Sequence, residues 1–308
     1  MFKKKNGNIV VISKPGKYEC GGTDATLDRS APKEIESEDM VFFSVASALG
    51  FISSPDSDNG ERFSDISYIS AFASKCDGGA FLFLHTGVSR YAGNDSYAFS
   101  LTKEDIFPCL DRIVRKYDFA KQNGFCSRTH GLPENFGGNV DIRYSSGEKI
   151  YFADNQSPVI SLAAAKEIAN LFFERLNRAD IGLPDLSALK EIRFEEKRND
   201  GFTAATLTLS PDGTGVNKKT SQYEGGEIFK SEKPVNGETV RAIKEKIEKC
   251  GLLLWRYLPN SDFCRESVKT LTFIFGNGKE ITATDDRNVP HKLGGGFFDV
   301  ELEMTAKH

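Results

Sequence analysis

The sequence repeats itself at long range, and this repeat constrains the fold more than any other feature. The segment Ser146–Ile150 recurs 131 positions later as Asn277–Ile281, and both segments have the character of a β-hairpin turn. Pro158 and Pro290 follow the two turns at nearly the same offset. A repeat at this distance predicts two similar units built in tandem.

The match extends back to a helix that precedes each hairpin. Ile106 and Ile113 on one predicted helix correspond to Val240 and Ile247 on another. At 308 residues the chain is longer than a single core normally supports, so two domains of about 120 to 150 residues are expected. We expect these domains to be residues 1–182 and 183–308.

The first unit is predicted to contain short strands, a helix, a hairpin and a second helix. The apolar residues of the first helix recur at helical spacing up to Tyr117, and Thr102 is a plausible N-cap. Two earlier strands, 9–12 and 41–45, precede the repeat and are expected to add to this unit. Its own strands are predicted at 69–73, 80–84 and 97–101, its hairpin at 140–152, and its second helix from 161.

The second unit shows the same order of patterns. Val240 to Ile247 form an apolar helical stripe that ends at Cys250 and Gly251. The tail from Phe297 to Met304 is compatible with either a helix or a strand. The strands are predicted at 191–195, 205–209 and 226–230, and the hairpin at 271–283. The fold class that follows is α+β, with each unit an antiparallel sheet packed with one or two helices.

Composition narrows the choice of compartment and partner. The net charge is −4, and the basic residues are dispersed among acidic ones, so nucleic acid is a poor candidate partner. No apolar run approaches the roughly 20 residues of a membrane span, and no secretory signal follows the N-terminal lysines. The 6 cysteines lack paired spacing, which favours reduced thiols. We therefore expect a cytoplasmic chain that binds no membrane.

Catalytic motifs are missing from the sequence. It contains no nucleophile elbow, no phosphate-binding loop, no His-Glu-x-x-His and no Cys-x-x-Cys, and we expect no cofactor and no metal. Cys126 and His130 are four residues apart and form either half of a zinc site, a thiol with a nearby base, or an ordinary polar loop. The ligand count favours the polar loop.

A second group of candidates lies in the other half of the chain. Trp255, Arg256 and Tyr257 are residue types that dominate interfaces, although the three leucines before them favour a core or inter-unit strand. His291 lies near two strand-closing acidic residues and is a candidate for a carboxylate-paired imidazole. The possible contact surface therefore comprises Trp255, Arg256, Tyr257, Asp285, Asp286, His291, Cys126 and His130.

These patterns support three hypotheses about function. The first is a non-enzymatic module that binds another protein or associates with itself. The second is a small-molecule enzyme whose site lies in the groove between the two units and uses Cys126, His130, Asp285 and His291. The third is a structural subunit of an oligomer, which predicts a large apolar patch.

Overall fold

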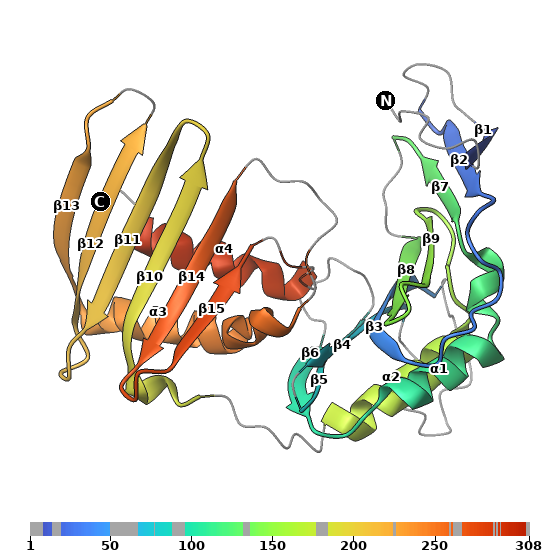
Figure 1. The fold of residues 1–308 in the computed structure, drawn as a ribbon, viewed down its shortest axis with the longest axis horizontal. Coiled ribbons are helices and arrows are strands. Elements are labelled where there is room, and N and C mark those ends of the chain that lie inside the picture. Colours follow the sequence, from blue (N-terminus) through green and yellow to red (C-terminus); the bar gives the residue numbers. More distant parts are fainter. Residues whose placement is uncertain are drawn as a thin grey trace. The chain divides into compact units, whose positions relative to one another are not determined.

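The computed structural model divides the chain into two compact units, Met1–Ile181 and Gly182–His308, named unit 1 and unit 2 (Figure 1). Each unit is described by itself. The structure describes residues 9–13, 20–49, 67–76, 78–87, 96–131, 136–176, 184–223, 226–258, 260, 267–285, 287, 289 and 291–305.

Unit 1 is an antiparallel sheet whose apolar face is covered by two helices (Figure 1). Four strands follow one another as a meander, then come a helix, a hairpin and a second helix. The hairpin returns beside the first strand, which gives the sheet order β9-β8-β3-β4-β5-β6. The elements are β3 (Met40–Ala48), β4 (Tyr68–Cys76), β5 (Gly79–Gly87), β6 (Ser96–Thr102), α1 (Phe107–Lys116), β8 (Gly138–Tyr144), β9 (Lys149–Asp154) and α2 (Leu162–Leu176).

Three more strands extend this sheet beyond β9. β1 (Ile9–Ser13) pairs with β2 (Thr23–Asp28), which pairs with β7 (Phe125–Thr129), both in antiparallel register. A short parallel pairing joins β7 to β9. The expected strands at 9–12 and 41–45 are present as β1 and β3. β2 was not predicted, because it lies within the stretch from Pro15 to Asp39, whose polar residues, Gly and Pro are typical of a loop.

Unit 2 repeats the six-strand part of unit 1 and its two helices, without counterparts of β1, β2 and β7. Its sheet order, β13-β12-β11-β10-β14-β15, corresponds to β6-β5-β4-β3-β8-β9 of unit 1. A short 3-10 helix, η3 (Leu186–Ala188), leads into the first strand. The elements are β10 (Leu189–Arg198), β11 (Gly201–Leu209), β12 (Gly215–Tyr223), β13 (Phe229–Val235), α3 (Gly237–Lys249), β14 (Val268–Phe275), β15 (Glu280–Thr284) and α4 (His291–Thr305).

The predicted fold class is confirmed: the chain is α+β, with two similar antiparallel units that each carry helices. The strand count was wrong, because each meander has four strands rather than three. β3 belongs to the repeat instead of preceding it, and β12 was missed because its sequence GVNKKTSQY is mostly polar. The tail that was compatible with helix or strand is helical, within α4.

Equivalent positions of the two units keep equivalent structural roles. Asp118 and Gly251 both adopt the left-handed conformation, with φ values of 52° and 58°. Each ends the first helix of its unit and starts a short 3-10 helix, η2 (Phe119–Gln122) or η4 (Leu252–Tyr257). Four buried residues of the last helix also match at a constant offset of 132. They are Ala164, Ala165, Ile168 and Phe172 in α2, and Gly296, Phe297, Val300 and Met304 in α4.

An ion pair joins the two helices in each unit, and its acidic residues occupy equivalent positions of the last helix, whereas its lysines lie about one helical turn apart in the alignment. Lys116 of α1 pairs with Glu167 of α2, and Lys246 of α3 pairs with Asp299 of α4 at 2.6 Å. Among the described helices, none is long and apolar enough to cross a membrane.

Candidate functional site

The two units differ at one end of the sheet face that the helices cover. The strand registers and the helix offset identify which residues are equivalent there. Unit 2 has Glu196, Lys269 and Glu301 where unit 1 has Ser47, Gly138 and Ala169. Three small residues in one copy are therefore three charged residues in the other.

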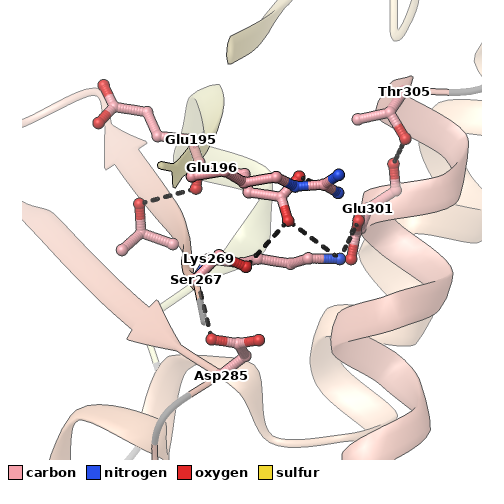
Figure 2. A network of polar contacts seen from close by, with 9 residues as sticks. Glu195, Glu196, Ser267, Lys269, Asp285, Glu301 and Thr305 are labelled. Carbon is pink, nitrogen blue, oxygen red and sulfur yellow. Dashed lines mark hydrogen bonds and ion pairs between the residues drawn. The ribbon is translucent and has the colours of Figure 1, made fainter. Parts of the chain in front are cut away.

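Glu196 is the centre of this charged network, which Figure 2 shows from close by. The residue is only 5% exposed, and glutamate is seldom buried without partners. Its Oε2 accepts a hydrogen bond from Arg198 at 2.8 Å, and its Oε1 accepts one from the Ser267 hydroxyl at 3.2 Å. Lys269 Nζ lies 3.9 Å from Glu196 Oε1 and 2.6 Å from Glu301 Oε1. The network thus joins β10, β14 and α4.

The C-terminal turn of α4 is held at the same place by side chains from β12. Asn217 Nδ2 donates to the carbonyl oxygen of Met304 at 2.8 Å, and Lys219 Nζ donates to that of Thr305 at 2.6 Å. The Thr305 hydroxyl donates to the Glu301 carbonyl at 2.8 Å. Helix-terminal carbonyls that lack intrahelical partners are satisfied in this way, so the network rests on a fixed helix end.

The charges of the network balance one another. Burial favours the neutral form of Glu196, but the hydrogen bond from Arg198 and the charge of Lys269 together hold its pKa below the usual value. Two carboxylates, Glu196 and Glu301, thus face two cations, Lys269 and Arg198. This arrangement of paired charges is suited to holding the side chains in place.

Beside the network, side chains of three strands form an exposed surface, which we call the Arg198 face: Arg198, Tyr223 and Phe229. Residues paired across neighbouring strands project from the same face of a sheet, as do residues two apart in one strand. Arg198 is paired with Gly201 and Gly201 with Tyr223, and Ser221, two residues before Tyr223, is paired with Phe229. Arg198, Tyr223 and Phe229 therefore project from the face that also carries Glu196. Tyr223 is 55% exposed and Phe229 is 62% exposed.

Arg198 is held in place on this face. Its hydrogen bond with Glu196 is the main reason why its pKa is raised, and Tyr223 is among the neighbours that add to the shift. Because Gly201 has no side chain, nothing from β11 fills the position between Arg198 and Tyr223. The guanidinium side chain is nevertheless 46% exposed, so donors remain open to solvent.

In unit 1 the equivalent place is a small apolar hollow. Leu49 replaces Arg198, and Ile69 and Thr86 replace Thr203 and Ser221. Its empty volume, including the opening to solvent, is about 230 Å³. The residues that line it are Leu49, Ile69, Thr86, Leu162, Ala165, Lys166 and Ala169.

Trp255 lies in the core of unit 2, the position that the three leucines before it favoured, and not on an exposed contact surface. This residue is 2% exposed, stacks on Phe297 with ring centroids 5.4 Å apart, and donates from Nε1 to the Cys250 carbonyl at 3.2 Å. It therefore belongs to the core of unit 2 and is unavailable as a contact residue. The segment is also a 3-10 helix, η4, rather than a strand. Arg256 and Tyr257 are half-buried, and the Arg256 guanidinium lies 4.5 Å from the Tyr257 ring centroid.

Cys126 and His130 lie on and just after β7 in unit 1. They are four residues apart along an extended segment, which corresponds to about 13 Å. Burial raises the pKa of the Cys126 thiol, the opposite of what activates a nucleophile. The partner of His130 is Asp24, whose Oδ2 lies 3.0 Å from Nε2. The sequence spacing gave no sign of Asp24, because β2 was not predicted.

The remaining candidates lie in unit 2. Asp285 accepts a hydrogen bond from the Lys269 N–H at 2.9 Å and so closes the β14–β15 hairpin beside the network (Figure 2). His291 is the first residue of α4. Asp286 and the side chain of His291 lie outside the described residues. The convergence of Cys126, His130, Asp285 and His291 in one groove stays a prediction.

One sequence signal could have pointed to the network. Glu196 is in phase with the buried Ile192 and Phe194 of β10, and Lys269 is in phase with Leu271 in β14. A charge on the apolar side of a strand needs a partner.

Within the part of the chain that the structure describes, no group of three or more His, Cys, Asp or Glu residues is placed to hold a metal ion. Neither the known protein families nor the curated proteins contain a match to this chain.

Proposed function

We propose that this protein is a non-enzymatic, cytoplasmic interaction module and that the Arg198 face of unit 2 is its main contact surface for another protein. The observation that carries the proposal is the exposure of Tyr223 and Phe229 beside a guanidinium that Glu196 already holds in place. Tyrosine and arginine are enriched at binding hot spots, and a side chain fixed before binding loses less entropy on association.

The divergence of the two units supports the same location. Where unit 2 has the charged network and the Arg198 face, unit 1 has Ser47 and the hollow beside Leu49. The two units therefore share their architecture but not this surface. The charge balance favours a protein partner over nucleic acid or a membrane, since Arg198 is already paired with Glu196 and the chain carries a net charge of −4.

Photo-crosslinking from position 223 in the full-length chain tests this proposal. The Tyr223 side chain is replaced by a photoreactive one, and the adducts formed in cells of the source organism are identified by mass spectrometry. We expect one specific protein adduct. The purified partner is then titrated against the wild type, and Arg198→Ala should weaken binding roughly tenfold or more.

Arg193 supplies a matched control on the same strand. It pairs with Glu191 at 2.6 Å and its side chain is 48% exposed, much as Arg198 pairs with Glu196, but it projects from the opposite face of the sheet. Arg193→Ala should leave binding unchanged. Equal binding by the Arg198→Ala variant, or no specific adduct at position 223, would contradict the proposal.

A further inference from the structure

We infer that the edge strand β13 binds the β13 strand of a second copy of the chain, in antiparallel register centred on Ser231. β13 is the last strand of the unit 2 sheet, and among the described residues it pairs with β12 alone. Its residues Phe229 to Glu232 and Pro234 are all exposed. An exposed edge of this kind is a template for another strand.

In this register, the charged residues of one β13 strand lie opposite residues of opposite charge in the second copy. With Ser231 opposite its own copy, Lys230 faces Glu232 of the second copy, and Glu232 faces the second copy's Lys230. A centre shifted by one residue would place Lys230 against Lys230, or Glu232 against Glu232. Opposite charges directly across a strand pair are stabilising and like charges are destabilising, so the register is specified.

The neighbouring strand supports the same charge pattern. Lys218 of β12 is paired with Glu232 and its Nζ lies 3.5 Å from the Glu232 carboxylate. The dimer would extend this pair into a row of alternating charge: Lys218, Glu232, and Lys230 of the second copy. Lysine on an edge strand commonly prevents other strands from pairing with it. Here glutamate alternates with lysine, so a second copy of β13 meets opposite charges and is not repelled.

Apolar residues lie at the ends of this ladder. Phe229, which is 62% exposed, would face the aliphatic stem of Lys233, and Ile228, 53% exposed, would face Pro234. Pro234 has no N–H to donate and therefore ends the ladder after five paired residues. The pairing is isologous, so it closes at two copies instead of growing into a fibre.

The contact area predicts a weak dimer. A standard interface buries roughly 35 Å² per residue, so the segment from Ile228 to Pro234 would bury about 500 Å² over both copies. Stable interfaces bury about 1,200 Å² or more. We therefore expect reversible dimerisation that becomes visible only at high protein concentration.

Sedimentation velocity of the full-length chain, from about 10 µM to 1 mM, tests the inference. The wild type should shift from monomer to dimer over this range. Lys230→Glu and Glu232→Lys should each weaken the dimer roughly tenfold, because each places two like-charge pairs in the ladder. An equimolar mixture of these two variants, and the double variant, should both recover wild-type association.

Three results would overturn the inference: a monomeric wild type at the highest concentration, a dimer that neither single variant weakens, or single variants that the mixture fails to rescue. Phe229 belongs to both surfaces, but the charge pairs that set the register can be tested apart from the Arg198 face, because Lys230 and Glu232 project from the opposite side of the sheet. Arg198→Ala should accordingly leave the dimer unchanged, which separates a failure here from a failure of the proposed function.

Discussion

Removal of one cation from the buried network is the most direct test of the energetics of unit 2. Lys269 is 21% exposed at its side chain, and its partners Glu301 and Glu196 are 12% and 6% exposed. Lys269→Met would leave Glu301 without its ion pair, whereas Glu196 would keep Arg198 and Ser267. Because one buried carboxylate loses its partner, we expect a loss of about 3 kcal/mol, at the low end for broken buried pairs.

A double substitution distinguishes the cost of an unpaired charge from the value of the pair itself. In Lys269→Met with Glu301→Met, both charges are gone and apolar side chains of similar length remain. Buried ion pairs can often be replaced in this way at little cost. The double variant should therefore unfold within about 1 kcal/mol of the wild type, as expected for coupled neighbours.

Trp255 provides an assay that reports on unit 2. It is the only tryptophan among 308 residues, and it stacks on Phe297 of α4. With an m-value of about 2 kcal/mol/M, the urea midpoint of unfolding of the Lys269→Met variant should lie about 1.5 M below that of the wild type. Lys218→Met, at a site 63% exposed, is the control and should change little. The coupling argument would be refuted if the stability lost by the double variant equalled the sum of the losses of Lys269→Met and Glu301→Met.

Three further outcomes follow from the geometry. Asp118→Gly should stabilise unit 1 by about 0.5–1 kcal/mol in calorimetry, because glycine adopts the left-handed backbone at this helix end without strain. Gly296→Ala should cost about 1–3 kcal/mol in a Trp255-monitored melt, since its Cβ would lie 2.3 Å from that of Cys250, whereas Gly295→Ala, which meets open space, should not destabilise. The pKa of Glu196 is lower in the folded protein than in the unfolded chain, where it is about 4.3. Its contribution to stability is therefore present above the unfolded pKa and is lost as the pH falls toward the folded pKa. Glu196→Gln should reduce the pH dependence of the free energy of unfolding between these two values.

The two units share their architecture and differ locally. The helix ends, an ion pair between the two helices and most of the buried face of the last helix recur in both units, and these features serve folding. The end of the sheet near Glu196 differs in charge, side-chain size and exposure. The proposed contact surface is located at this point of difference.

The sequence by itself determined the features that depend on near neighbours. The hairpin turns around Gly147 and Gly278 have left-handed glycines, and the helical stripe of Val240 and Ile247 lies buried in α3 as its spacing predicts. Such patterns arise from the two-residue and 3.6-residue periods of strands and helices, which a sequence displays directly. Because the same order of local patterns recurs in both halves of the sequence, the long-range repeat predicted the α+β class and the two similar units correctly.

Only the tertiary structure decided which distant residues meet. Glu196, Lys269 and Glu301 lie up to 105 positions apart in the chain, and strand register together with the placement of α4 brings them together. The same register assembles Arg198, Tyr223 and Phe229 from three strands, while close packing buries Trp255 despite its interface-like composition. Residue types alone could not rank these sites, because whether an aromatic or a charge is exposed depends on what the rest of the chain packs against it.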